Sequence, residues 1–366
     1  MSNAYRTKNS TGLINKNKKI NFSFNGHTYH GYEGDTLASA LISNGIHLIG
    51  RSFKYHRPRG FLGVGVEEPN AMVQLHEGNK SEPNIIATEV ELVEGLKAKS
   101  QNCWPSVQFD IGEVNNLLNR FFPAGFYYKT FMWPKSFWMK IYEPFIRKAA
   151  GMGVAPLQPD PDRYEHNYEH CDVLVVGSGP SGLASALAAA KNGARVILAE
   201  DKANFGGSLL TDEVTIGNMS GKEWANDTVA QLKSLPNVIL KKRSQVFGYY
   251  DHNMTVMIER VSDHQENPSK YTPRQRLHYI RAGEVIVSTG SIERPISFGN
   301  NDRPGILLAS AAKEYMTVYE TLVGKKPIIF TNNDTAYSTA LEFLKNDITP
   351  VTVSYTHLRA HETACY

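Results

Sequence analysis

The glycine-rich stretch from Gly177 to Gly182 constrains the fold of this chain more than any other feature. The apolar run 172–176 precedes it and an alanine-rich segment, 183–191, follows it. In such a strand–turn–helix unit the first glycine permits the tight turn, the second lets a pyrophosphate approach the backbone, and the third lets the helix pack on the sheet. The helix N-terminus then attracts phosphate. The stretch predicts a Rossmann-like FAD/NAD(P)-binding domain; a glycine turn that only packs a βαβ unit is the alternative.

Three later segments have the composition expected at the same site. Glu200 ends a second predicted strand, 194–199, where a carboxylate can accept ribose hydroxyl protons and repel a 2′-phosphate. NAD or FAD is therefore favoured over NADP, and the pattern does not separate these two because both contain ADP. Small-residue turns follow at 206–208 and 289–290. The predicted cofactor-binding residues are Gly177, Ser178, Gly179, Pro180, Ser181, Gly182, Glu200, Asp201, Gly206, Gly207, Ser208, Thr289 and Gly290.

The N-terminal part has a different pattern, which predicts an α+β fold. Residues 20–24 alternate between apolar and polar, Asn25-Gly26 is a hairpin turn signal, and 27–32 forms the returning strand. Gly34-Asp35-Thr36 then offers an N-cap to a short apolar helix. Hairpin, helix and further short strands predict a ferredoxin-like β-grasp domain.

The chain is expected to divide into five parts. They are a flexible tail at 1–19, the β-grasp domain at 20–98, an aromatic connector at 99–165, an incomplete dinucleotide domain at 166–353 and an artefactual tail at 354–366. The connector contains three of the four tryptophans and many Phe and Tyr residues. It either packs across two domains or forms a partner-binding surface, because aromatic residues concentrate at interfaces.

Composition excludes several classes of function. Lys and Arg number 39 against 36 Asp and Glu, so the net charge of +3 gives no case for nucleic acid. The three cysteines have no metal or disulfide spacing, which favours a reducing, cytoplasmic environment. No apolar run is long enough to span a membrane. Neither a catalytic constellation nor a metal motif is identifiable.

A basic loop stands out at 51–60. Arg51, Lys54, Arg57 and Arg59 lie within ten residues of one another. A solvated charged loop is the ordinary interpretation, and an anion site or a partner-docking loop is the functional one.

Long unusual strings give the chain a resemblance to the alpha subunit of heterotetrameric sarcosine oxidases. They cover about residues 20–350 and are far more specific than the glycine turn. They lie at 51–60, 67–70, 125–134, 142–144, 149–153, 248–251, 292–295, 300–305 and 332–337.

This resemblance implies an oxidoreductase complex acting on CH–NH groups, with oxygen as acceptor. Sarcosine would be demethylated to glycine, with peroxide and a one-carbon unit as the other products. This chain would bind NAD, while FMN and FAD belong to the complex, and FAD in place of NAD is the alternative. The partners would be beta, gamma and delta subunits, with sarcosine and tetrahydrofolate handled outside this chain, which alone would be inactive.

The resemblance also bears on iron–sulfur chemistry. Related ferredoxin-like domains carry a [2Fe–2S] cluster on a cysteine-rich loop, whereas the corresponding stretch here, 60–68, has no cysteine. Because thiolates are the usual ligands, no iron–sulfur cluster is expected. Two other functions stay open: a self-contained FAD-dependent oxidoreductase of the pyridine-nucleotide type and a non-catalytic scaffold subunit.

Overall fold

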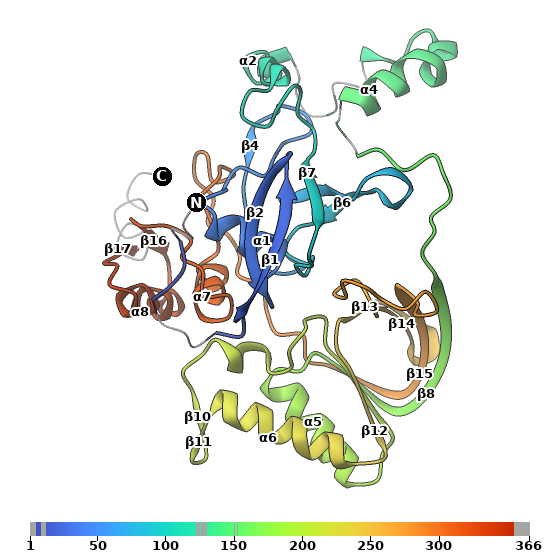
Figure 1. The fold of residues 1–366 in the computed structure, drawn as a ribbon, viewed down its shortest axis with the longest axis vertical. Coiled ribbons are helices and arrows are strands. Elements are labelled where there is room, and N and C mark those ends of the chain that lie inside the picture. Colours follow the sequence, from blue (N-terminus) through green and yellow to red (C-terminus); the bar gives the residue numbers. More distant parts are fainter. Residues whose placement is uncertain are drawn as a thin grey trace, which may run out of the picture. The chain divides into compact units, whose positions relative to one another are not determined.

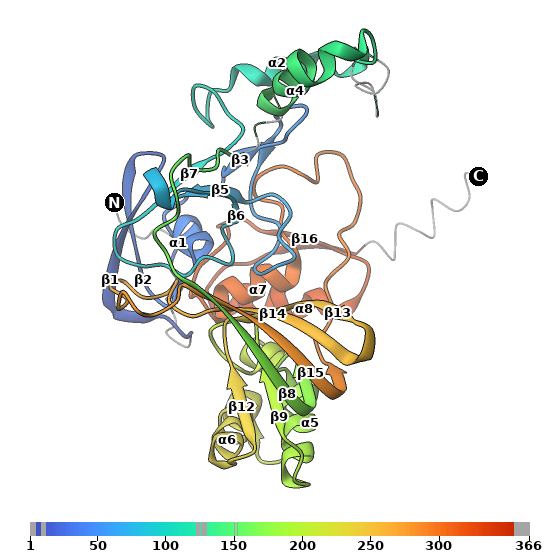
Figure 2. The same ribbon diagram turned by 90° about the vertical axis from the view of Figure 1, so that its right-hand side faces the viewer.

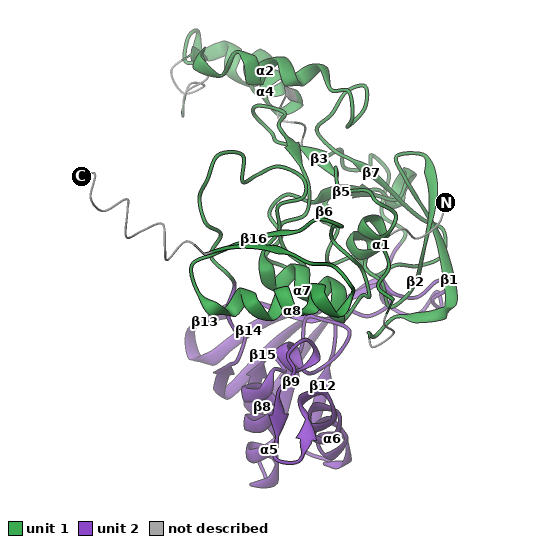
Figure 3. Cartoon of the chain, turned by 90° about the vertical axis from the view of Figure 1, so that its left-hand side faces the viewer, with its two compact units in different colours: residues 1–161, 293–366 green, residues 162–292 purple. Residues whose placement is uncertain are grey.

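The structure is a computed structural model, and it describes residues 5–8, 12–121, 125, 130–149, 151 and 153–354. The chain forms two compact units (Figure 3). Unit 1 comprises Met1–Pro161 together with Glu293–Tyr366, and unit 2 comprises Asp162–Ile292. No helix in the described part of the chain is long and apolar enough to cross a membrane.

Unit 1 is built on a five-stranded mixed sheet with the strand order β2-β1-β7-β5-β6. Strands β1 and β2 form the predicted hairpin, and Asn25 and Gly26 both have the positive φ angles that such a tight turn requires. Strand β7 runs parallel to β1, as the return strand of a β-grasp fold does. The strands are β1 (Asn15–Phe24), β2 (His27–Glu33), β5 (Met72–Leu75), β6 (Glu82–Ile86) and β7 (Leu96–Ser100).

Helix α1 (Leu37–Ser43) is buried along its whole length. Its N-terminus is a capping box, in which the Thr36 side chain accepts from the backbone of Ser39 and the Ser39 side chain accepts from the backbone of Thr36. The fully buried Asp35 carboxylate accepts from the Ser39 hydroxyl at 2.7 Å and pairs with Arg6. A polar network therefore fixes the entry to this helix.

The remaining elements of unit 1 are short. Residues Gly50–Arg51 (β3) and Pro58–Arg59 (β4) form a small ladder, and β16 (Ile328–Thr331) pairs in parallel with β17 (Val351–Ser354). The further helices are η1 (Gly78–Lys80), η2 (Ile111–Glu113), α2 (Val114–Leu117), η3 (Asn119–Phe121), η4 (Lys135–Phe137), the π-helix η5 (Trp138–Tyr142), α4 (Glu143–Ala149), α7 (Ala309–Thr317), η8 (Asp334–Ala336) and α8 (Tyr337–Lys345).

A buried carboxylate organises the loop between β4 and β5. Glu68 is 2% exposed, and its two oxygens accept four backbone N–H groups at 2.6–3.1 Å, from Leu62, Gly63, Asn70 and Ala71. Burial raises the pKa of this carboxyl group, although the four N–H donors oppose that effect. The loop therefore folds around one negative side chain.

Unit 2 contains a six-stranded sheet with the order β12-β9-β8-β15-β14-β13 (Figure 1). Strands β12, β9, β8 and β15 are parallel neighbours, and β13, β14 and β15 form an antiparallel meander. The first three parallel strands of the unit, β8, β9 and β12 in chain order, thus lie side by side with β9 between the other two. This is the arrangement of a dinucleotide-binding half-domain. They are β8 (Tyr164–Val176), β9 (Val196–Ala199), β12 (Val238–Lys241), β13 (Ser244–Tyr250), β14 (Met254–Arg260) and β15 (Gln275–Val287).

Two helices cover one face of this sheet (Figure 2). Helix α5 (Pro180–Lys191) packs Leu183 and Ala186 on the core, and α6 (Gly221–Ser234) adds Ala225 and Leu232. A second cluster, which includes Leu174, Met257 and Ile280, forms a separate core in the same sheet. The small elements of the unit are η6 (Gly207–Leu210), β10 (Thr215–Ile216), β11 (Met219–Ser220) and η7 (Asp251–Asn253).

The structure divides the chain differently from the five predicted parts. Strand β1 begins at Asn15, inside the predicted tail, and Thr7 and Leu13 donate backbone hydrogen bonds to the carbonyl oxygens of Glu320 and Val318. Residues 293–353, which were assigned to the dinucleotide domain, cluster with unit 1. Most of the aromatic string 121–128 and the tail beyond Ser354 lie outside the described residues.

Replacing Glu68 with Gln should lower the free energy of unfolding by about 3 kcal/mol, because an amide NH₂ would then face N–H donors inside the protein. Urea denaturation measures the change. Glu67→Gln is the control: the Glu67 carboxylate is only partly buried and accepts two N–H groups, from Val64 and Gly65. Equal losses in the two variants would contradict the role given to Glu68.

Candidate functional site

The glycine turn links the end of β8 to the start of α5. Gly177 has a φ angle of +94°, and a Cβ atom there would lie 2.4 Å from the Ser288 carbonyl oxygen. At Gly182 a Cβ atom would lie 1.9 Å from the carbonyl oxygen of Gly177. Both positions exclude any side chain, so these two glycines are required by the packing of the turn itself.

Gly179 differs from its two neighbours in the motif. An added Cβ atom there would meet no protein atom within 4 Å. Gly179 is the N-cap of α5, Pro180 occupies the first turn, and no side chain caps this end of the helix. Ser181 completes the turn on the exposed side. The backbone at Gly179 is thus open to a group from outside the protein, at a helix end that favours negative charge.

Glu200 ties the turn to the end of the second strand. It is 6% exposed, and one of its oxygens accepts from the Ser178 backbone N–H at 3.0 Å and from the Ser178 hydroxyl. Its other oxygen accepts from the N–H of Lys202 at 3.1 Å. The sequence pattern does not predict this bond to Ser178. The only hint in the sequence was a hydroxyl side chain, that of Ser178, between the first two glycines of the turn.

The protonation of Glu200 is shifted by its surroundings. Burial, followed by the neighbouring Asp201, raises the pKa of Glu200 to about 7, against the opposing effect of the Ser178 and Lys202 hydrogen bonds. The Asp201 carbonyl oxygen is held by Arg260 at 2.6 Å. The acid at this position therefore carries a proton for part of the time near neutral pH.

The two small-residue turns lie against the same glycine turn. The Gly206 N–H donates to the carbonyl and the hydroxyl oxygen of Ser178, and a Cβ atom on Gly207 would lie 2.8 Å from the Gly179 Cα. Ser208 lies in η6 directly after them. Thr289 Cα would lie 3.2 Å from a Cβ atom on Gly177, and Gly290 follows with a φ angle of +70°. The predicted segments thus converge within unit 2.

The basic loop of unit 1 is largely neutralised by its own neighbours. The Arg51 guanidinium is buried and donates to the carbonyl oxygens of Val107 and Gln108 and to Glu113. Arg57 and Arg59 both pair with Asp302, whose pKa they lower well below its usual range. Lys54 lies over the Tyr55 ring at 4.9 Å. Three of the four cations therefore hold loops together.

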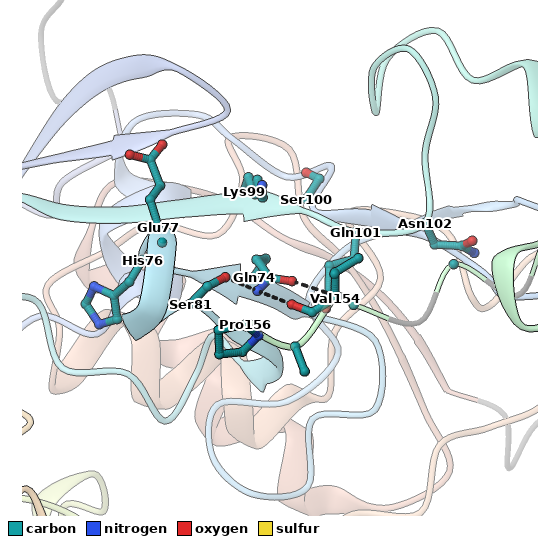
Figure 4. A pocket seen from close by; sticks show the side chains of 14 residues that line it. Gln74, His76, Glu77, Ser81, Lys99, Ser100, Gln101, Asn102, Val154 and Pro156 are labelled. Carbon is teal, nitrogen blue, oxygen red and sulfur yellow. Dashed lines mark hydrogen bonds between the residues drawn. The ribbon is translucent and has the colours of Figure 1, made fainter. Parts of the chain in front are cut away.

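A separate hollow of about 500 Å³ lies beside the β-grasp sheet (Figure 4). The Gln74 amide crosses it, donating to Ser81 and to the Val154 carbonyl and accepting from the Val154 N–H. Asn84 accepts from the Gly153 N–H at 3.1 Å. The hollow is thus closed on one side by the segment 153–156, which amide side chains bind to the sheet.

Unit 2 also holds a buried ion network that the sequence does not reveal. His278 is fully buried between Glu169, at 2.9 Å, and Glu259, at 2.8 Å. Burial opposes the charged imidazole, but the two carboxylates outweigh it and raise the pKa of His278, while the histidine lowers the pKa of Glu169 to about 2. The network links β8, β14 and β15, while the second Glu169 oxygen, Oε2, is buried with no hydrogen-bond partner among the described residues.

This fold and site define a class: an oxidoreductase domain of the FAD-dependent, dinucleotide-binding type beside a ferredoxin-like domain. Two family models match accordingly, "FAD dependent oxidoreductase" at residues 172–249 and "2Fe-2S iron-sulfur cluster binding domain" at residues 17–103. The solved L-proline dehydrogenase from P. horikoshii shares the fold over 96% of this chain and 56% of its own, with a TM-score of 0.62 and 19% identity.

Curated relatives share more of the sequence. The sarcosine oxidase subunit alpha of Rhizobium meliloti (strain 1021) is 52% identical over 90% of this chain, and that of Corynebacterium sp. (strain P-1) is 34% identical over 88%. The chain spans 34% and 29% of their lengths, respectively. Over the aligned residues, this chain is similar to the alpha subunits of sarcosine oxidases.

One expectation about cofactors is corrected by these matches. The predicted absence of an iron–sulfur cluster is contradicted by the 2Fe-2S family model at residues 17–103. That stretch has a single cysteine, Cys103, and the described residues contain no group of three or more His, Cys, Asp or Glu that could hold a metal ion. Because thiolates are the usual ligands, these residues do not fit the group, and no step is assigned to a cluster here.

Gly179 and Gly182 should respond differently to replacement by alanine. Gly182→Ala should lower the free energy of unfolding by about 2 kcal/mol or more, since the methyl group forces the helix off the turn. Gly179→Ala, with open space around its Cβ position, should change stability by about 0.5 kcal/mol at most. Thermal or urea unfolding measures both, and equal losses would contradict the division between packing and open positions.

Glu200 should make stability depend on pH. A folded-state pKa near 7, above the value of an unfolded glutamate, gives a contribution that is complete below about pH 4 and is lost as the pH rises through 7. Glu200→Gln should remove this pH-dependent loss of stability. The loss amounts to about 3 kcal/mol in the free energy of unfolding, at about 1.4 kcal/mol for each pKa unit. Urea denaturation at acidic and alkaline pH tests it, with the exposed Glu284→Gln as control. An unchanged pH dependence in Glu200→Gln would refute the assignment.

Proposed function

We propose that this chain is the cofactor-binding alpha component of a sarcosine oxidase complex. The observation that carries the proposal is the 52% identity to a sarcosine oxidase subunit alpha over 90% of the chain. The complex would oxidise sarcosine to glycine, with peroxide and a one-carbon unit as the other products. Its partners would be beta, gamma and delta subunits, with sarcosine and tetrahydrofolate bound outside this chain, in the reducing environment that the spacing of its cysteines favours.

Within that complex, we assign dinucleotide binding to unit 2. The uncapped N-terminus of α5 would meet the pyrophosphate over Gly179, and Gly206, Gly207 and Ser208 would border it. Thr289 and Gly290 would close the opposite side. Glu200 keeps Ser178 in place and leaves its carboxyl group next to the expected ribose position. FAD is named by the matching family model, whereas the resemblance to the alpha subunit implies NAD.

No residue of this chain is assigned to the chemistry on sarcosine. The buried His278 of unit 2 is engaged by Glu169 and Glu259 within the sheet. The chain's contribution would be to bind, orient and shield the dinucleotide. The two alternatives, a self-contained oxidoreductase and a non-catalytic scaffold, are not favoured by the high identity to the alpha subunits.

Purified protein should release one adenine dinucleotide on heating, and mass spectrometry identifies it as FAD or NAD. Gly179→Leu should abolish retention because its side chain fills the approach to the helix N-terminus. Its unfolding midpoint should stay close to that of the wild type when both proteins are compared without dinucleotide, because a bound ligand stabilises the native state. Leu344→Ala, an exposed change in α8 of unit 1, is the control for purification losses. Full dinucleotide content in Gly179→Leu would remove the assigned site.

Assembly is tested separately from cofactor binding. The chain, extended to the full length of its relatives and produced with beta, gamma and delta subunits, should form peroxide when sarcosine is added, and Gly179→Leu should lose that activity. A complex that holds dinucleotide but forms no peroxide with sarcosine would show that another amine is the substrate. Protein that never retains a dinucleotide would favour the scaffold.

A further inference from the structure

A long segment of unit 1 has no core of its own. We call the described residues between 111 and 149, namely 111–121, 125 and 130–149, the arm; it contains η2, α2, η3, η4, η5 and α4. None of its described residues is buried, although it is rich in large apolar side chains. Trp133 is 83% exposed and Phe145 is 67% exposed, and others include Leu117, Phe121, Trp138 and Met139. Monomeric proteins rarely leave so many large apolar groups in water.

The arm is anchored to the β-grasp domain at both ends. Before it, Arg51 binds the carbonyl oxygens of Val107 and Gln108, and His56 contacts the buried Asp110 at 2.6 Å. After it, the backbone of residues 153 and 154 is held by Asn84 and Gln74, beside the hollow in Figure 4. The β-grasp domain therefore fixes both ends of the arm without burying the arm itself.

The arm has local order despite its exposure. The Tyr142 hydroxyl donates to the Trp133 carbonyl oxygen at 2.9 Å, and the Tyr142 ring packs on Phe131 and Phe137 at 5.2 and 6.1 Å between centroids. These contacts join η4 and η5 into a small aromatic knob. Its outward aromatic side chains are therefore presented in a defined arrangement.

The charge of the arm restricts what can cover it. Residues 111–149 contain six Lys and Arg against two Glu. Both glutamates are paired with arginines, Glu113 with Arg51 and Glu143 with Arg147. A second copy of the same surface would place like charges together, whereas an apolar surface ringed by carboxylates would match it.

We propose that the arm is the docking surface for another subunit of the complex, which offers apolar pockets rimmed by Asp and Glu. This rests on the proposed function, because it names the surface by which the chain would join its partners. Aromatic residues, Met and Arg are enriched at protein interfaces. A membrane surface is disfavoured, because it is usually bound by a long amphipathic helix, whereas the helices of the arm are three to seven residues long.

The test measures binding of the purified beta subunit of the Rhizobium meliloti enzyme to this chain. Trp133→Asp/Phe145→Asp should weaken capture by about thirtyfold or more, the effect expected on losing interface hot spots. Dinucleotide content and the unfolding midpoint should not change, because neither side chain is buried. The matched control is Tyr271→Asp/Leu341→Asp, which introduces the same charges at exposed positions outside the arm and should bind as the wild type does.

Each other outcome decides against the arm as a subunit interface. Equal capture by wild type and arm variant would overturn the docking surface while leaving the proposed function intact. A wild type that captures no beta subunit would overturn both. Wild-type dimers in sedimentation, lost in the arm variant, would assign the surface to a second copy. Arm-dependent binding to phosphatidylserine vesicles, with beta-subunit capture unaffected, would assign it to a membrane.

Discussion

The close approach of Gly182 to the carbonyl oxygen of Gly177 is the contact on which unit 2 depends. It brings the first turn of α5 onto the end of β8, at a distance that no Cβ atom would allow. From there α5 packs along the sheet through Leu183 and Ala186. The same approach leaves the backbone of Gly179 open, at the end of the helix where the dipole is positive. Packing and the candidate binding surface thus follow from a single constraint.

Buried carboxylates hold the backbone in both units. Glu200 accepts the N–H and hydroxyl of Ser178 in one, and Glu68 accepts four N–H groups of its loop in the other. In each case burial raises the pKa and the donors oppose the shift. Such an arrangement costs desolvation free energy but gives hydrogen-bond partners to backbone N–H groups of the loop that would otherwise be buried without one. The buried carboxylates therefore order the backbone locally, and they also make the free energy of unfolding depend on pH.

The features that were predictable from sequence are those in which a few adjacent residues determine the backbone. Asn25-Gly26 predicted the hairpin, and the glycine turn at 177–182 predicted the βαβ unit. Partners far apart in the chain could not be read in this way: Arg57 with Asp302, Glu200 with Ser178, and His278 with two carboxylates are brought together only by tertiary structure. The grouping of residues 293–354 with the β-grasp domain was missed for the same reason, because its interactions connect distant segments such as Leu13 and Val318.

The basic loop and the arm show why charge and apolarity must be judged by what surrounds them. The loop at 51–60 has the more conspicuous cluster of basic residues in the sequence. However, Arg57 and Arg59 form ion pairs with Asp302, and Arg51 donates hydrogen bonds to backbone carbonyl oxygens. The arm has more basic than acidic residues together with exposed aromatic rings, on elements joined by Tyr142. Burying such rings is worth about 25 cal/mol for each Å² removed from water. Of the two surfaces, the arm therefore has the larger free energy to gain from a partner.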